Sequence, residues 1–313
     1  MSTPANSTTT STMSNLVLAA YDKLVEFQLR SEPLFRNFAD KRPADVDKPG
    51  SSVVLQRYQD LAVATSALTQ ADIPDAVALS NTTSTTITLN EYGNSVLTTE
   101  LLSTESLSAI DPYVANVIAW NMRDSLDTLV RNVLIGGTNV VYCESSALNT
   151  TGPTNTLAAT DVFSSKAVRY VVSKLRGNSA VPGEGGYYTG LIHPDQSHDL
   201  RAETGTAAWR DPHVYSGANS IWNGEIGIYE GVRFIESPRI KQATDGTGSA
   251  KVSRGLIFGR QALAEAVGYE PKVVAGPITD NLLRFRPLGW KALIGWAIYR
   301  QEAIYRVESG STY

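Results

Sequence analysis

Two β-rich segments in the first third of the chain cannot cover each other, and this restricts the folds open to the sequence. The first, SSVVLQRYQDL, begins at Ser51, and the second, STTITLNEYGNSVLTT, ends at Thr99. In the second, Thr85, Ile87 and Leu89 share one face of a strand. Residues 64–83 between them are small and polar, so the pair reads as an extended hairpin. A two-stranded ribbon is at best marginally stable in water, and an isolated monomer offers little to cover it.

A long helix is predicted directly after this hairpin. Asp111 is a good N-cap and Pro112 a good first helical residue. Gly136 and Gly137 end the pattern. Residues 111–135 would form a spine about 37 Å long at 1.5 Å per residue. Its apolar residues recur at helical spacing: Val114, Val117, Ile118, Met122, Leu126, Leu129, Val130 and Val133.

The rest of the chain mixes helices and strands, which predicts an α+β fold. Residues 1–15 are Ser/Thr-rich and expected to be disordered. A helix is expected next, because one helical face carries Leu16, Ala20, Leu24 and Phe27. A short helical piece follows Pro33, and residues 41–51 are predicted to form a loop. Strands are expected in TNVVYCES, YYTGLIHP, SRGLIFG and twice in EIGIYEGVRFIESPRI. Helices are expected from Thr160 to Gly177, with Asp161 in the first turn, and in RQALAEAVG, ending at Gly268. The last segment is strand-rich, broken at Pro287 and Gly289.

Composition excludes several classes of protein. The net charge is −4 and the pI about 5.5, with no basic arm or acidic tail that would indicate a highly charged partner. Cys143 is the single cysteine, so no intrachain disulfide forms, and its apolar surroundings predict a buried thiol. No apolar run reaches the roughly 18 residues that cross a bilayer, and the N-terminus lacks a secretory signal.

The segment LIHPDQSHDL is the best candidate for an active site. His193 and His198 are five residues apart, which is about 140° around a helix and unsuited to a paired metal site. Pro194 favours an extended His193 and a helix that begins after it, with Asp195 in the first turn. We interpret the cluster as turn and capping chemistry, and His213 as structural or interfacial. We therefore predict no catalytic, cofactor-binding or metal residues and no enzyme activity.

Other catalytic and binding signatures are missing. The sequence has no G-x-S-x-G elbow, no phosphate loop and no G-x-G-x-x-G after a strand. PGEGG lacks a following lysine and reads as a flexible loop. The aromatics around Lys291 favour core packing over base stacking. Arg169, Lys174 and Arg176 fit either DNA contact or a solvated helix end.

The order of these parts resembles the major capsid proteins of tailed double-stranded DNA bacteriophages, which have the Hong Kong 97-type fold. KPGSSVVLQRYQDL and IPDAVALSNTTSTTITLNEYGNSVLTTE resemble the arm and hairpin of one such family. DTLVRNVLIGGTN, YYTGLIHPDQSHDLRAE, GEIGIYEGVRFIESPR and PLGWKALIGWAIYRQEAIYRVES resemble its later signatures. The resemblance covers most of the chain from Ser51 onward.

The resemblance implies a structural role for each segment of the chain. Residues 1–50 would be the N-terminal tail and arm, and residues 51–100 an extended loop lying across a neighbouring subunit. Residues 101–137 would hold the spine helix of a peripheral domain, 138–275 an axial domain, and 276–313 strands returning to the peripheral domain. The expected partners are copies of the chain in pentamers and hexamers, packaged DNA through non-specific contacts, and scaffolding, portal and decoration proteins. No membrane is expected: the shell would form in the host bacterial cytoplasm and become the virion capsid.

Two features depart from the type member of that fold, in which a lysine of the extended loop forms an isopeptide bond with a neighbour. No lysine lies between Gly50 and Glu100, so we predict no loop-lysine crosslink. No long helical extension precedes Asn15, so a fused scaffolding domain is not expected, while a separate scaffold or prior cleavage stays open. Two other functions also stay open: a nanocompartment shell protein of the same fold, and a soluble hydrolase using His193, Asp195 or His198.

Overall fold

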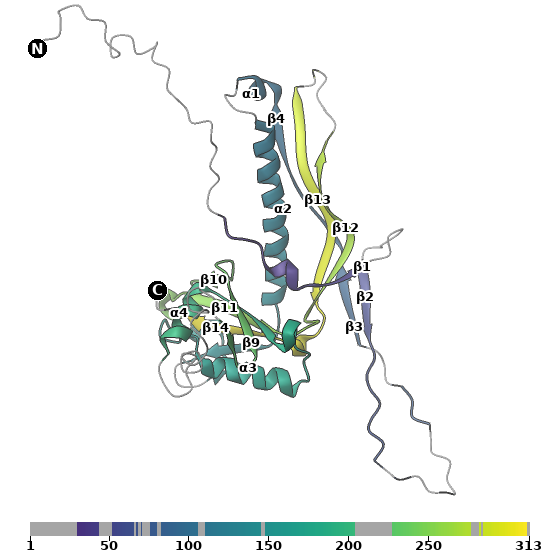
Figure 1. Ribbon diagram of the computed structural model, residues 1–313, viewed down its shortest axis with the longest axis vertical. Coiled ribbons are helices and arrows are strands. Elements are labelled where there is room, and N and C mark those ends of the chain that lie inside the picture. Colours follow the sequence, from purple (N-terminus) through teal and green to yellow (C-terminus); the bar gives the residue numbers. More distant parts are fainter. Residues whose placement is uncertain are drawn as a thin grey trace, which may run out of the picture.

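The structure is a computed structural model that describes residues 30–43, 52–65, 67, 70, 76–79, 83–105, 110–144, 148–203, 227–276, 282 and 284–311. The predictions for the N-terminal tail, the helix from Asn15 and His213 lie outside these residues. The described chain is an α+β fold, as predicted. Figure 1 shows an elongated part, a compact part and a ribbon that projects away from both.

The elongated part is a sheet with a long helix along one face. Helix α2, Ile110–Ile135, confirms the predicted spine, although the side chains of Asp111 and Pro112 lie outside the description. Its Ile118 and Leu126 pack against Trp290 and Ile294 of the sheet. The sheet order is β1-β12-β13-β4, with β1 parallel to β12 and the other pairs antiparallel. The bounds are β1 Asp40–Pro43, β4 Asn90–Thr99, β12 Leu263–Ala275 and β13 Phe285–Ile298; α1, Glu100–Glu105, follows β4.

The ribbon consists of β2, Ser52–Arg57, and β3, Thr83–Thr88, paired antiparallel as predicted. Its base lies on the sheet face opposite α2, where Ile87 is fully buried in a cluster with Ala264 and Ala266. Gly295 lies directly beneath the backbone of Thr88, and a Cβ there would collide with its carbonyl oxygen. The expectation that the chain offers the ribbon little cover is therefore wrong for its base. Residues 90–99, grouped with the hairpin by sequence, instead pair with β13.

The compact part is built on an eight-stranded sheet with the order β6-β5-β14-β11-β7-β9-β8, and β10 pairs with β11. The strands are β5 Val140–Cys143, β6 Leu148–Asn149, β7 Tyr188–Ile192, β8 Ile228–Tyr229, β9 Val232–Glu236, β10 Gln242–Ala243, β11 Val252–Phe258 and β14 Ile304–Gly310. The helices are α3 Ser165–Gly177 and α4 Pro194–Ala202. Short 3-10 helices are η2 Phe35–Phe38, η3 Thr154–Thr156, η4 Glu184–Gly186, η5 Thr247–Ser249 and η6 Gln301–Ala303.

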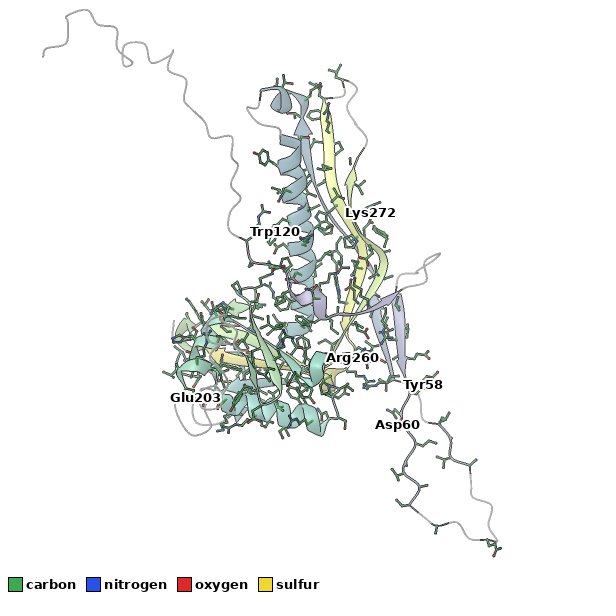
Figure 2. The ribbon with its side chains drawn as sticks, viewed as in Figure 1. Tyr58, Asp60, Trp120, Glu203, Arg260 and Lys272 are labelled. Atoms are coloured by element: carbon green, nitrogen blue, oxygen red, sulfur yellow. The ribbon has the colours of Figure 1, made fainter. Side chains whose placement is uncertain are left out.

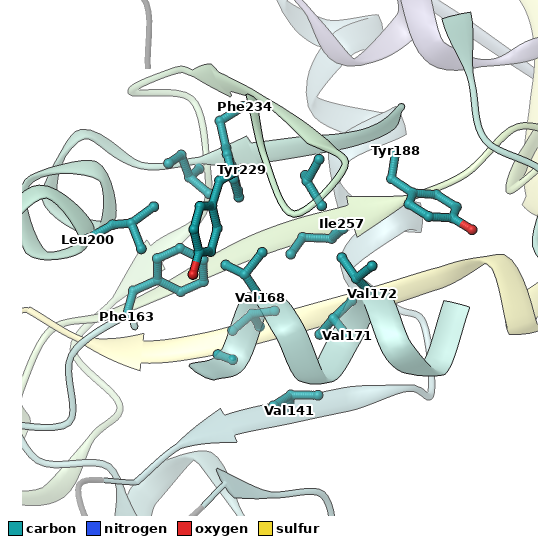
Figure 3. Close-up of a cluster of buried hydrophobic side chains, with 14 of the residues drawn as sticks. Val141, Phe163, Val168, Val171, Val172, Tyr188, Leu200, Tyr229, Phe234 and Ile257 are labelled. Atoms are coloured by element: carbon teal, nitrogen blue, oxygen red, sulfur yellow. The ribbon is translucent and has the colours of Figure 1, made fainter. Parts of the chain in front are cut away.

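The core of the compact part forms where α3 lies on this sheet. Figure 3 shows Val168, Val171 and Val172 of α3 facing the strands, with Phe234 and Ile257 among the residues opposite. The predicted strands here are confirmed, and β8 and β9 meet at a turn where Glu230 and Gly231 both have positive φ. The α3 helix begins later than predicted. Asp161 lies before it and accepts a hydrogen bond from the Ala158 amide at 2.8 Å instead of occupying the first turn.

The largest error in the sequence predictions concerns residues 260–268. RQALAEAVG was expected to be helical, but Leu263 begins the long strand β12. Its two edges are paired with β1 and β13, and Ala264 and Ala266 are the small residues that let the ribbon pack closely. Long-range pairing has overridden the helix propensity of alanine. Residues 41–43, expected in a loop, form β1 for the same reason.

Neither Pro287 nor Gly289 interrupts β13. The Pro287 carbonyl accepts a hydrogen bond from the Gly276 amide at 3.0 Å, just past the end of β12. The proline nitrogen, which has no hydrogen to donate, therefore faces a point where the ladder ends, and such a position tolerates proline. Strand pairing also crosses the predicted boundary at residue 275, because β12 joins the elongated sheet and β14 lies inside the compact one.

Candidate assembly surface

The histidine cluster is positioned by the junction between β7 and α4. The Asp195 amide donates to His193 Nδ1 at 3.2 Å, and the His193 amide donates to Gln196 Oε1 at 3.2 Å. This is a reciprocal capping box at a helix N-terminus. The prediction that His193 ends a strand and that Pro194 begins a helix is confirmed.

Asp195 and His198 are also occupied by local structure. Burial raises the pKa of the Asp195 carboxyl, but hydrogen bonds from Gln242 and Ser311 outweigh it and hold that pKa below its usual value. His198 is half exposed, with Nδ1 3.6 Å from Asp199 Oδ1. Within the described ranges, no group of three His, Cys, Asp or Glu side chains is arranged to hold a metal ion. The geometry of this cluster is that of a structural junction.

Cys143 is buried in the core of the compact part, as predicted. Burial raises the pKa of its thiol to about 12. The thiol is therefore protonated at neutral pH, whereas nucleophilic cysteines depend on the thiolate.

The described residues of the outer part of the ribbon, beyond Arg57, are exposed and not buried. Beyond Arg57 the described residues of the connection carry large apolar side chains that touch no core. Tyr58 is 75% exposed, Val63 85% and Leu79 76%. Figure 2 shows Tyr58 and Asp60 well clear of the body of the molecule. Apolar side chains gathered on a projecting segment are typical of interaction surfaces.

A buried carboxylate joins the N-terminal segment to both parts of the molecule. Asp127 of α2 is 1% exposed and accepts a hydrogen bond from the Phe35 amide at 2.6 Å. Its second oxygen accepts from Arg239 Nε at 2.8 Å. A buried carboxylate is stable only when it is paired in this way. The spine is therefore a fixed axis on which the arm and the compact part are held.

A second buried ion pair fixes the arm to the elongated sheet. Arg36 Nη2 lies 2.6 Å from Glu265 Oε1, and Glu265 of β12 is fully buried. Sequence reasoning found neither this pair nor Asp127, because each partner is more than 90 residues from the other and no local pattern marks it.

The match to a known family covers most of this architecture. Residues 41–304 match the model of the phage capsid protein family. The chain belongs to that family. It is a phage capsid protein, as the sequence resemblance predicted.

Solved capsid structures share its fold across nearly the whole chain. The capsid of cyanophage Pam1 is 14% identical, with a TM-score of 0.77, and the match covers 99% of this chain and 100% of that one. The head of the Helicobacter pylori bacteriophage KHP40 is 14% identical, with a TM-score of 0.73 and 99% of both chains covered. A capsid of a native GTA particle, computed with C5 symmetry, is 15% identical, with a TM-score of 0.68 and 98% and 100% covered.

No curated protein matches the capsid chain in sequence. None of the helices in the described part combines the length and the hydropathy needed to span a membrane. Exposed apolar side chains of this capsid protein lie on the ribbon and on the elongated sheet, among them Tyr58, Val63 and Leu97.

Proposed function

We propose that this subunit assembles with its own copies into pentamers and hexamers that close around double-stranded DNA. The observation that carries the proposal is the projecting ribbon, whose base is packed on its own sheet while its outer part exposes Tyr58, Val63 and Leu79. Apolar groups held away from the body gain burial only on another molecule. A neighbouring copy supplies that surface in every subunit of a closed shell.

The predicted domains fit this role as a working division. Residues 1–50 act as the tail and arm, 51–100 as the extended loop, and 101–137 as the spine of a peripheral domain. Residues 138–275 form the axial domain, which meets its copies around the symmetry axes, and 276–313 return to the periphery. The pairing of β12 with β13 and of β14 with β11 refines the division by moving each strand to the sheet it joins. A fivefold arrangement of copies is part of this proposal, and one structure of similar fold is a capsid computed with C5 symmetry.

The remaining functional assignments follow from the proposed role of the chain as a subunit of a DNA container. The chain acts structurally and without catalysis, because His193 and Asp195 serve a helix cap. Scaffolding, portal and decoration proteins are its further partners, DNA is held by non-specific contacts, and assembly takes place in the host bacterial cytoplasm.

Electron microscopy and size-exclusion chromatography of the full chain expressed in bacteria test the proposal. We expect closed shells with fivefold vertices. A variant in which Tyr58–Thr82 is replaced by a short Asn-Gly turn should keep the far-ultraviolet circular dichroism of the parent but form no shells. A full chain that stays a compact monomer at every concentration overturns the proposal, as does a shortened chain that assembles normally.

A further inference from the structure

A cavity of about 440 Å³ lies between the N-terminal arm and the compact part. Residues 37–40 of the arm form one wall, and the turns at residues 183–187 and 259–261 form another. We call this space the arm cavity. Figure 2 labels one of its lining residues, Arg260, at the end of the compact part nearest the ribbon base.

The floor of the arm cavity is one face of the compact sheet. Thr189 of β7 pairs with Arg233 of β9 and with Phe258 of β11, and all three line the cavity. Their strand neighbours Tyr188 and Phe234 pack in the core that α3 covers. Because side chains alternate along a strand, Thr189 and Arg233 point to the opposite face. The cavity and α3 therefore lie on opposite sides of the sheet.

Contacts made elsewhere hold the walls in place. The Arg260 amide donates a hydrogen bond to the Val181 carbonyl at 2.8 Å, which fixes the turn after β11. On the arm side, the Phe38 ring meets the Phe258 ring edge-on, with the centroids 5.5 Å apart. The arm is also anchored by the buried carboxylate of α2. The arm cavity is thus formed in the free subunit, and binding of a ligand requires little ordering.

The polar side chains in the lining are poorly matched by the chain itself. Those without a hydrogen-bond or ion-pair partner in the described part of the chain are Asn37, Tyr187, Thr189, Arg233, Arg260 and Gln261. Asp40 is the one acidic residue in the described lining, and it already accepts a hydrogen bond from Arg42 Nη2 at 2.8 Å. The two guanidinium groups of the cavity are therefore left without a counter-charge.

This imbalance narrows the chemistry of a ligand. Guanidinium groups bind carboxylates and phosphates through paired hydrogen bonds. A carboxylate carries a single negative charge, whereas a phosphate monoester carries about 1.5 to 2 near pH 7 and presents three acceptor oxygens. Two arginines without a counter-charge therefore favour a phosphate monoester over a lone carboxylate.

The size of the arm cavity indicates that the phosphate carries an organic group. Sites for small molecules have volumes of about 300–1,000 Å³, and the arm cavity falls in this range. Ile235 and Phe258 supply apolar lining, and the Tyr187 ring is 38% exposed. Aromatic rings of this kind stack on nucleobases without regard to sequence.

We propose that the arm cavity binds a small phosphate monoester, with Arg233 and Arg260 on the phosphate and Tyr187 against the organic group. A nucleoside monophosphate has the charge and the size that the lining requires. The inference goes beyond the proposed assembly of shells, because residues of one chain form the walls and the floor. The ligand touches the arm and the compact part together, so binding stabilises the contact between them.

Isothermal titration calorimetry of the unassembled full chain tests the inference, with deoxyadenosine monophosphate as the probe. We expect the nucleotide to bind at a single site. Inorganic phosphate should bind more weakly, and deoxyadenosine, which lacks the phosphate, should not bind. A chain that binds neither the nucleotide nor inorganic phosphate overturns the inference. Deoxyadenosine that binds as tightly as the nucleotide overturns it as well.

A pair of double variants locates the site. Arg233→Gln with Arg260→Gln should weaken binding of the nucleotide at least about tenfold, because hydrogen bonds between charged groups are lost. Arg169→Gln with Arg176→Gln removes the same charge from α3, on the other side of the sheet. Both control arginines are exposed, and salt screens such charges, so the affinity should change by less than about twofold. Equal losses in the two double variants would follow net charge and overturn the inference.

Modification by phenylglyoxal gives a readout that needs no variant. The reagent attacks accessible guanidinium groups, and peptide mass spectrometry follows each arginine separately. Saturating deoxyadenosine monophosphate should block modification of Arg233 and Arg260 and leave that of Arg169 and Arg176 unchanged. Continued modification of the cavity pair overturns the inference, whether or not the double variant folds.

Two competitors separate a monoester from other anions. Triglutamate represents an acidic protein segment, and a short DNA duplex represents packaged DNA. Neither should displace the nucleotide at an equal concentration of negative charge. Displacement by triglutamate that depends on Arg233 and Arg260 would assign the arm cavity to an acidic segment of a protein. The same result with the duplex would assign it to the DNA backbone, and either outcome overturns the inference.

Failure of this inference and failure of the proposed function are distinguishable, because binding is measured on subunits and assembly on shells. A chain that binds the nucleotide but forms no shells keeps the site and loses the proposed function. A chain that forms shells but does not bind the nucleotide loses only the site.

Discussion

The base of the ribbon packs on the sheet of its own chain, whereas the outer part of the same ribbon is exposed. At the base, Ile87 is fully buried and Leu89 is 7% exposed, because β12 and β13 of the same chain lie beneath them. In the outer part, Tyr58 and Val63 are exposed although they follow directly from β2. The same hairpin is thus complete as a folding unit at one end and incomplete at the other. Folding of the subunit therefore depends on residues such as Ile87, whereas assembly of the shell depends on residues such as Tyr58 and Val63.

The largest effect on the isolated subunit is expected from Ile87→Ala. Truncating a fully buried isoleucine removes its transfer free energy and leaves a cavity, which costs about 2–5 kcal/mol. Urea unfolding of the unassembled chain measures the loss. Val54→Ala is the matched control, because Val54 lies in the adjacent strand of the same ribbon and is 51% exposed. Equal free energies of unfolding for the two variants would show that the base is not packed on its own sheet.

The features that sequence reasoning predicted are those set by local pattern. The alternation around Ile87 predicted a strand, helical periodicity predicted α2, and Pro194 after His193 predicted the cap of α4. Each depends on residues a few positions apart, so the sequence shows it directly.

What was missed depends on contacts between distant segments. Ala264 and Ala266 read as helix formers, and only the packing of Ile87 over them explains why they lie in a strand. The opposition of Lys272 and Lys291 was missed as well, because they become neighbours only through the pairing of β12 with β13. The exposure of the outer ribbon could be inferred from the sequence. The connection between the two predicted strands is long and contains apolar residues, and no other segment was predicted to pack over it.

A smaller effect on the free energy of unfolding is expected from the ion pair that joins the ribbon base to the compact part. Arg57 Nη1 lies 3.5 Å from Glu302 Oε2. A backbone amide hydrogen bond lowers the pKa of the Glu302 carboxyl, burial opposes it, and the Arg57 guanidinium lowers it further. Because the folded pKa is below the unfolded one, the pair stabilises the chain above the unfolded pKa, and this contribution is lost as pH falls through the folded pKa.

Glu302→Gln tests this tie. Glu302 is half exposed, so solvent limits the contribution to a few tenths of a kcal/mol. Free energies of unfolding of the parent and the variant should differ by that amount near about pH 7 and converge as the pH falls below the usual range for glutamate, about 4. A difference that stays constant across that range would mean that the carboxylate charge does not hold the ribbon base.

The smallest effect on the isolated subunit is expected in the outer ribbon, where the effect on assembly should be greatest. Replacing Tyr58, Val63 and Leu79 together with serine removes side chains that pack on nothing in the subunit, so its free energy of unfolding should change by no more than about 0.5 kcal/mol. Shell formation, followed by light scattering, should fall sharply, because burial of these side chains on a neighbour is lost. Tyr58→Phe, Val63→Ile and Leu79→Met together keep the apolar surface and should assemble normally. Serine substitutions that destabilise the monomer as strongly as Ile87→Ala would mean that the outer ribbon is already covered by its own chain, and the contrast between the two ends would disappear.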